Sequence, residues 1–253
     1  MTTDISIEDV ATITKFIKKF KAKDENLIEF KILYEIPPMK NFLRSFQQVE
    51  RIALKLIENE APWFNVFDIL HINHLEAKVH TPFLAELLSP DGTHMQGRLF
   101  FDAFMKRLLQ GVYEASAVTH INIVTELGDY DNGRMDIVIS YKENDVPKGI
   151  VIENKIYHHD EKEQLVRYYK HLTERKGLKP GQFHLVYLTP YKTKPSTTSI
   201  DEDLYNQLVE MKAITEWGYH KDIAPLFTEL MPFIKAPVVT QTLYQYIQTI
   251  QSL

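Results

Sequence analysis

Three short apolar runs lie between residues 121 and 155, and they restrict the fold of this chain more than any other feature of its sequence. The runs are INIVTEL, RMDIVIS and KGIVIENK, and each is rich in β-branched residues. Gly, Asn, Asp and Pro separate them, which is the pattern of strands that end in turns. Because only the short segment YKENDVPKG separates the last two runs, we expect these two strands to form a hairpin.

The sequence on both sides of these runs has helical periodicity. Apolar residues recur at helical spacing, and the paired prolines Pro37 and Pro38 interrupt the N-terminal part. Helices are predicted over residues 6–20, 39–60, 81–88, 97–109, 160–177, 221–231 and 238–251. Further strands are predicted at FHLVYLTP (183–190) and AITEWGY (213–219). This order of helices and strands predicts a layered α/β fold.

Composition limits the classes of protein to consider. Of the 253 residues, 44% are hydrophobic and 25% are charged, which is typical of a globular protein. No apolar run is long enough to span a bilayer, so no membrane partner is expected, and the N-terminus lacks the pattern of a signal peptide. The absence of cysteine excludes disulfides and fits a reducing compartment, so a cytoplasmic location is expected.

The formal net charge of −5 argues against a protein that coats nucleic acid through its overall field. Contact with nucleic acid would need a local group of cations. The candidates are Lys148, Arg167, Lys192 and Lys194. A solvated charged loop is the default interpretation of these residues.

Three charged residues stand in strands that are otherwise apolar. Glu153 and Lys155 are two apart, so their side chains leave the same face of one strand about 6–7 Å apart, and the hairpin brings Asp136 beside them. Asn154 points to the opposite face. Two buried carboxylates repel each other unless a partner compensates them. A hard dication such as Mg²⁺ provides that partner, and Lys155 would then orient a water molecule or stabilise charge on a phosphate.

An ion-paired cluster on a half-exposed face of the sheet is the alternative interpretation of these three residues. The strand GIVIENK is apolar up to its acidic end. An ion pair on a solvated face does not need such hydrophobic surroundings, so we favour the metal site.

The arrangement resembles the PD-(D/E)XK nuclease superfamily, in which an Asp in one strand is followed by Glu-x-Lys in the next. Here Asp136 is separated by 16 residues from Glu153-Asn154-Lys155. Met135 replaces the proline of the motif, at a position that varies widely in the superfamily. A wider resemblance to one bacterial subfamily lies in EAKVHTPFLAELLSPDGTHMQGRLFFDAFM, followed in the subfamily's order by GRMDIVI, IENKIY, QLVRYY, VYLTP and YQYIQTIQ. It covers roughly residues 65 to 253.

The resemblance implies a restriction-endonuclease-like fold with a four- or five-stranded mixed sheet between helices. It implies a nuclease-like domain over residues 61–253, preceded by an N-terminal helical extension over residues 1–60. It further implies dependence on Mg²⁺, or Mn²⁺ in its place, and hydrolysis of phosphodiester bonds in nucleic acid, with DNA favoured over RNA. A homodimer is compatible with this assignment.

The resemblance also assigns roles to individual residues. Metal ligands would be Asp136, Glu153, the backbone carbonyl of Asn154 and, from an N-terminal helix, Glu76. Lys155 would assist the attacking water, and Gln164 would belong to the catalytic group near the active site, with a solvated helix amide as its alternative. Tyr168, one turn further on the same helix, would contact the nucleic acid, with a core aromatic as the alternative. Independently of the resemblance, Arg134 beside Asp136 would bind a substrate phosphate bidentately or cap the start of the strand.

Other polar residues keep two interpretations. Glu126 would either reach the metal from the adjacent strand or lie at the surface. His71, His74, His80 and His94 lack the cysteine partners of a zinc site. Within the resemblance, His80 and His94 are expected to brace the region of Glu76 by hydrogen bonds. In YHHD (157–160) the histidines would contact a phosphate, or the turn would cap the next helix through Asp160.

A catalytically silent relative that binds nucleic acid or a protein partner is the competing function, because fold does not guarantee activity. A hydrolase of a smaller phosphate ester is a third. The sequence leaves open endonuclease or exonuclease action, DNA or RNA, sequence preference, oligomeric state and biological pathway.

Overall fold

The computed structural model describes residues 11–15, 37–110, 112–129 and 133–253. The chain divides into two compact units, residues 1–65 and 66–253. The predicted boundary at residue 60 lies close to this division. Among the described residues, no helix combines the length and apolar character needed to cross a membrane.

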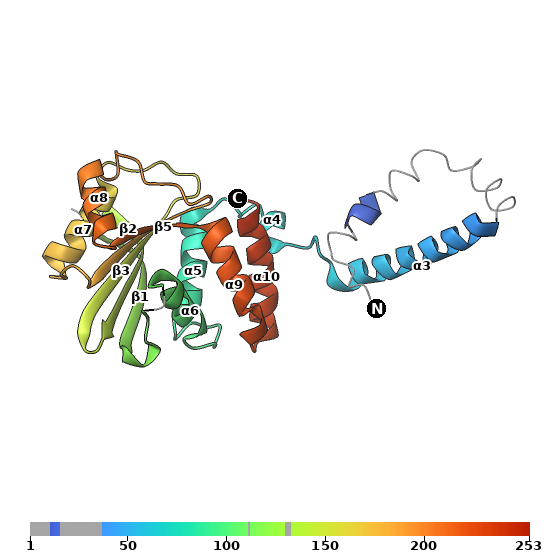
Figure 1. Cartoon of the computed structure of the whole chain (residues 1–253), viewed down its shortest axis with the longest axis horizontal. Coiled ribbons are helices and arrows are strands. Elements are labelled where there is room, and N and C mark those ends of the chain that lie inside the picture. Colours follow the sequence, from blue (N-terminus) through green and yellow to red (C-terminus); the bar gives the residue numbers. More distant parts are fainter. Residues whose placement is uncertain (1–10, 16–36, 111, 130–132) are drawn as a thin grey trace. The chain divides into compact units, whose positions relative to one another are not determined.

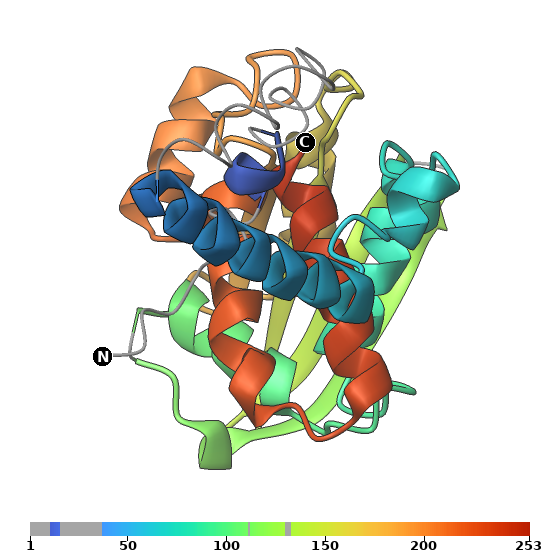
Figure 2. The same ribbon diagram turned by 90° about the vertical axis from the view of Figure 1, so that its right-hand side faces the viewer.

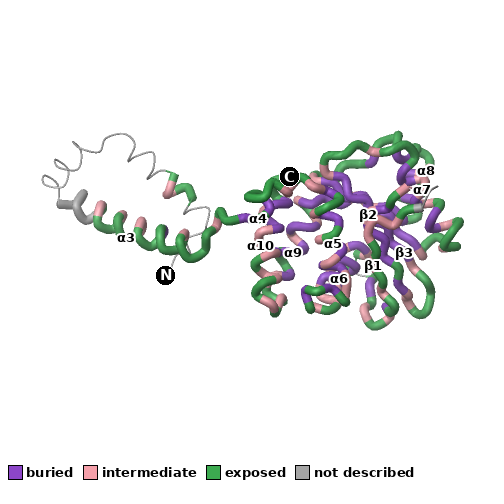
Figure 3. The backbone as a smooth tube through the Cα atoms, turned by 180° about the vertical axis from the view of Figure 1, so that it is seen from behind, coloured by how far each residue is buried: buried purple, intermediate pink, exposed green. Residues whose placement is uncertain are grey.

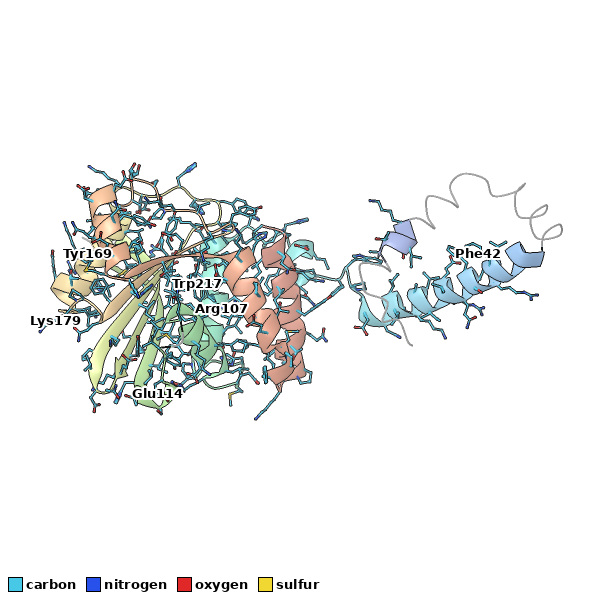
Figure 4. All side chains as sticks on the ribbon, viewed as in Figure 1. Phe42, Arg107, Glu114, Tyr169, Lys179 and Trp217 are labelled. Atoms are coloured by element: carbon cyan, nitrogen blue, oxygen red, sulfur yellow. The ribbon has the colours of Figure 1, made fainter. Side chains whose placement is uncertain are left out.

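The first unit contains the long helix α3 (Pro37–Glu60). The helix begins at the paired prolines, because proline lacks only an N–H that has no helical partner in the first turn. Several apolar side chains of α3 are exposed, including Phe42, labelled in Figure 4. Residues 11–15 are helical, and the rest of the helix predicted over residues 6–20 lies outside the described residues.

The second unit is built on a five-stranded sheet in the order β1-β2-β3-β4-β5. The strands are β1 (Val118–Asp129), β2 (Gly133–Glu143), β3 (Val146–Asn154), β4 (Phe183–Thr189) and β5 (Ile214–Gly218). The first three are antiparallel neighbours, and β4 and β5 continue the sheet in parallel with β3. The predicted mixed sheet in an α/β fold is therefore confirmed.

The predicted hairpin joins β2 to β3 through a two-residue turn. Glu143 pairs with Val146, and the residues between them, Asn144 and Asp145, have φ of 50° and 61°. Positive φ at both central residues is the requirement of a type I′ turn, and Asn and Asp accept it readily. This turn fixes the register between the two strands, and with it the positions of Asp136 and Glu153.

Helices cover both faces of the sheet, as Figure 1 shows. One face packs against α5 (Thr81–Leu88), α6 (Leu99–Leu108), α9 (Ala224–Leu230) and α10 (Pro237–Gln251), and the other against α7 (Gln164–Lys170) and α8 (Glu202–Glu210). The last two helices of the chain, α9 and α10, lie side by side (Figure 2). Figure 3 shows the buried segments of the sheet between these layers. Each face therefore has its own hydrophobic core.

Helical segments that are not α-helical extend several of these helices. The π-helical segments Glu76–His80, His171–Arg175 and Tyr219–Ile223 adjoin α5, α7 and α9. The short helix α4 (Val66–Ile69) and 3₁₀ turns at Ala115–Ala117 and Met231–Phe233 complete the unit.

Two local features of the structure differ from the sequence analysis. Helix α8 was not predicted, although Asp201 caps it through Leu204 N and its apolar residues have helical spacing. Regular alternation along β2 would put Met135 on the same face as Ile137, but Met135 packs in the other core, with Val138. The strict alternation of β2 ends where its neighbour β1 leaves the extended conformation, at Glu126 with φ of 54°.

Replacement of Phe104 by alanine is expected to lower the free energy of unfolding by about 3–5 kcal/mol. Phe104 is 1% exposed and packs edge-on against Trp217, with ring centroids 4.9 Å apart, so truncation leaves a cavity beneath the sheet. Figure 4 labels Trp217 in this layer. Urea denaturation measures the change. Phe233→Ala is the control, because that side chain is 65% exposed and its loss should cost less than about 0.5 kcal/mol.

Candidate active site

The register of the sheet places three acidic residues in one row across β1, β2 and β3. Ile137 pairs with Ile152, so the next step along the hairpin sets Asp136 opposite Glu153. On the other side, the pairs that flank Glu126 and Asp136 place these two residues opposite each other. Residues opposite each other in an antiparallel pair project from the same face, so acids from three strands are gathered at one edge of the α7 layer.

Lys155 and Gln164 both contact Glu153. Lys155 Nζ lies 2.9 Å from Glu153 Oε1, and Gln164 Nε2 donates to the same oxygen at 2.6 Å. The other oxygen, Oε2, is buried and has no hydrogen-bond partner among the described residues. A buried carboxylate oxygen without a donor is unfavourable, so this atom is available to a proton or to a cation.

Asp136 is tied to the next strand through Asn154. The Asn154 N–H donates to Asp136 Oδ2 at 2.8 Å. The side chain of Asn154 leaves the opposite face, as predicted, and bonds to Thr81 and Tyr219 there. Asn154 therefore contributes only its backbone to the side of the sheet that carries Asp136.

Glu76 reaches the site from the π-helical segment before α5. Its Oε2 accepts from Ile156 N at 2.5 Å, and its Oε1 lies 3.3 Å from His158 Nδ1. The carboxylate is buried, and it lines the same hollow as Asp136 and Glu153. The contact with Ile156 was not predicted, because nothing in the local sequence links two positions 80 residues apart.

These side chains line an open hollow of about 1020 Å³. Its wall contains the carboxylates of Glu76, Glu126, Asp136, Glu153 and Glu161, and the polar or cationic groups of Arg134, Lys155, His158, His159 and Gln164. Five acidic residues line the hollow, but only two of the described side chains there, Arg134 and Lys155, are lysine or arginine. The hollow therefore accommodates a polyanion only if positive charge is added.

Burial and mutual repulsion change the ionisation of the site. Burial, reinforced by the charge of Glu76, raises the pKa of Asp136 to about 7, against the opposing bond from the Asn154 amide. Burial and the charge of Asp136 raise the pKa of Glu153 to about 8. Burial alone would lower the pKa of Lys155, but the charge and hydrogen bond of Glu153 outweigh it and raise that pKa. Near neutral pH both carboxyl groups therefore hold protons for part of the time. A bound cation, in addition to Lys155, would favour their ionised forms.

The donor set fits a hard divalent cation. Two adjacent carboxylates with raised pKa, one of them with a bare buried oxygen, match the oxygen ligands that Mg²⁺ binds while keeping several waters. In the part of the chain that the structure describes, no group of three or more Asp, Glu or His side chains is already gathered for a metal ion. Backbone and water oxygens would have to complete the coordination.

The structure corrects the expected role of Tyr168. This residue is fully buried, and its hydroxyl donates to Arg134 O at 2.7 Å while accepting from Gln164. It cannot contact a substrate from this position. Tyr168 instead joins the helix that carries Gln164 to the strand that carries Asp136. Arg134 is exposed, but its guanidinium is bonded to Glu126 at 2.8 Å, which gives Glu126 a partner at the rim of the hollow.

Each of the four predicted cations has an acidic partner. Lys148 pairs with Glu143, Arg167 with Glu161, Lys192 with Asp222 and Lys194 with Glu202. Each cation is neutralised by a neighbouring acid, which a composition argument cannot detect.

Two other polar predictions also need correction. Asp160 does not cap α7; it accepts from Tyr187 OH and Ser196 N, both at 2.8 Å, and so holds the loop after β4 to the segment after β3. His94 closes its own turn through Ser89 O and Gln96 N, away from Glu76. His80 bonds to Asn73 O at 2.8 Å, in the loop that leads to Glu76.

Comparison with protein families identifies the family of this chain. A family model described as "PD-(D/E)XK nuclease superfamily" matches residues 64–248. No curated protein and no solved structure matches the chain. The matched range contains every element that builds the hollow.

Proposed function

Because this chain belongs to the PD-(D/E)XK nuclease superfamily, we propose that it is a metal-dependent nuclease that hydrolyses phosphodiester bonds, with DNA as the favoured substrate. One observation carries the proposal. Asp136, Glu153 and Lys155 meet in a single open hollow, with a buried oxygen of Glu153 left without a partner. A metal ion at that oxygen would satisfy it and would offset the repulsion between the two carboxylates.

The proposal gives a role to each predicted metal ligand and to the two residues that contact Glu153. Asp136 and Glu153 would hold Mg²⁺ or Mn²⁺ together with the Asn154 carbonyl, and Glu76 would contribute directly or through water. The ion would supply a Lewis acid and an activated water. Lys155, 2.9 Å from Glu153, would direct its ammonium to the water and to the negative charge that develops on phosphate. Gln164 holds the Glu153 carboxylate, so it acts as a positioning residue.

Arg134 is the residue that we assign to the substrate phosphate. Its exposed guanidinium at the rim can exchange Glu126 for a phosphate group, since carboxylate and phosphate both accept hydrogen bonds from arginine. The bound metal ion would offset the acids that surround the hollow. Both substrate binding and catalysis are therefore expected to depend on the metal.

The test is incubation of the purified protein with supercoiled plasmid, linear duplex, single-stranded DNA, RNA and a nitrophenyl phosphodiester. Each substrate is tested with Mg²⁺, with Mn²⁺ and with chelator. Metal-dependent cleavage of DNA is expected, with nicking of the plasmid showing endonuclease action. Metal-dependent binding of DNA without cleavage would instead favour a catalytically silent module that binds nucleic acid. Turnover of the nitrophenyl ester alone would favour a hydrolase of smaller phosphate esters.

A further inference from the structure

A buried hydrogen-bond network lies behind the candidate site, on the opposite face of β3. Tyr219 OH donates to Asn154 Oδ1 at 3.0 Å, and Asn154 Nδ2 donates to Thr81 Oγ1 at 3.1 Å. All three residues are 0% exposed. Both ends of the Asn154 amide are therefore held, one by the segment before α9 and the other by the first residue of α5.

The same asparagine reaches the site through its backbone. Its N–H holds Asp136, and its neighbours along β3 are Glu153 and Lys155. A rotation of the Asn154 peptide would release the Asp136 carboxylate and would turn both flanking side chains. The position of the site thus depends on how firmly this one residue is fixed.

The residues that hold Asn154 are themselves held. His80, next to Thr81, bonds to Tyr246 OH at 3.1 Å, and its ring packs against Tyr219 with centroids 5.6 Å apart. A core that needed only packing would be served by apolar side chains here, because each buried polar group is unfavourable unless it is bonded. A fully bonded network gives orientation that packing alone does not provide.

We propose that Tyr219 and Thr81 are positioning residues of the site. They fix the Asn154 peptide from behind the sheet, and through it they set the orientation of Asp136 and Glu153 toward a divalent cation. This inference rests on the proposed function, since it takes these two acids as metal ligands. Loss of a residue that orients a metal ligand typically weakens metal binding about 10- to 100-fold.

Two substitutions remove single groups from the network. Tyr219→Phe removes only the hydroxyl, and Thr81→Val replaces an acceptor by a methyl group of similar size. Thr81→Ser keeps the acceptor and serves as the conservative variant. Tyr113→Phe is the control, because Tyr113 lies in the same hydrophobic core and donates to Asp102 without contacting Asn154.

Mn²⁺ binding by calorimetry, amide hydrogen exchange in residues 153–156 and thermal melting are measured for each variant. Tyr219→Phe and Thr81→Val are expected to raise the Kd for Mn²⁺ about 10- to 100-fold and to speed exchange in this segment. Thr81→Ser and Tyr113→Phe are expected to keep the wild-type Kd and exchange. Tyr113→Phe should nevertheless lower Tm, which shows that lost stability alone does not weaken the metal site.

The inference is overturned if Tyr219→Phe lowers Tm as Tyr113→Phe does while Mn²⁺ binding and exchange stay at the wild-type level. If Tyr219→Phe does not fold, equal Mn²⁺ affinities for Thr81→Val and Thr81→Ser overturn it. A wild-type protein that binds no Mn²⁺ overturns both this inference and the metal-dependent mechanism. A protein with Tyr219-dependent Mn²⁺ binding that cleaves no DNA supports the inference and contradicts the proposed nuclease.

Discussion

Lys155→Met is expected to reduce metal-dependent DNA cleavage about 10²- to 10⁴-fold. Methionine keeps most of the length and the apolar stem of lysine, so the substitution removes the ammonium and little else. That ammonium is the only cation that an ion pair joins to Glu153 among the described residues, and it lies inside the hollow. Initial rates of plasmid nicking at saturating Mg²⁺ measure the effect. Because Lys155 is not expected to bind the metal, the Mg²⁺ concentration for half-maximal activity should change much less than the rate.

Lys162→Met is the matched control for this prediction. Lys162 is exposed on the segment that leads to α7, and its side chain does not line the hollow. Its replacement should leave the cleavage rate within about twofold of the wild type, as expected for a surface change. Wild-type cleavage by Lys155→Met would show that the ammonium has no part in the reaction.

The fold was largely predictable because its signals are local. The β-branched runs became strands, and the Asn144–Asp145 turn set the hairpin that unites Asp136 with Glu153. Asn154 turned to the opposite face because side chains alternate along a strand. In these cases the strand, the turn or the direction of the side chain depends on residues only a few positions apart.

The supporting contacts of the site could not be predicted, because they join positions far apart in the chain. Glu76 bonds to Ile156, and Tyr219 bonds to Asn154. No periodicity links such positions before the tertiary fold is known. Tyr168 had a recognisable position one turn after Gln164, but its contact with the Arg134 carbonyl depends on how α7 packs on β2. Local pattern thus located the charged groups, and tertiary packing decided which of them face the hollow.

Without metal, the site is expected to destabilise the protein as pH rises from about 4 to about 8. The folded pKa values of Asp136 and Glu153, about 7 and about 8, lie above the ordinary values of 3.8 and 4.5. The folded state therefore holds more protons than the unfolded state within this window, and its stability falls as pH rises. Each extra proton contributes up to about 1.4 kcal/mol per pH unit. Urea denaturation in chelator, at constant ionic strength, measures this slope.

Glu153→Gln tests how much Glu153 and its repulsion with Asp136 contribute to this pH dependence of stability. Buried His184, whose pKa burial lowers to about 4, pushes the slope in the opposite direction below pH 6.5, so only the difference between variant and wild type is diagnostic. The variant should be more stable than the wild type at pH 8 in chelator, because it removes a carboxylate whose charge burial and Asp136 both disfavour. Glu174→Gln, at an exposed carboxylate, should leave the slope unchanged.

Addition of Mn²⁺ should reverse the pH dependence of the wild type. The ion binds the ionised carboxylates, so its binding releases protons and its stabilising effect should grow as pH rises toward 8. Calorimetry in buffers of different ionisation enthalpy counts the protons released. Glu153→Gln should gain little stability from Mn²⁺ at any pH. Equal slopes of stability against pH, and equal responses to Mn²⁺, for wild type and Glu153→Gln would contradict both claims. They would show that the pKa of Glu153 is not raised in the folded state and that Glu153 is not a metal ligand.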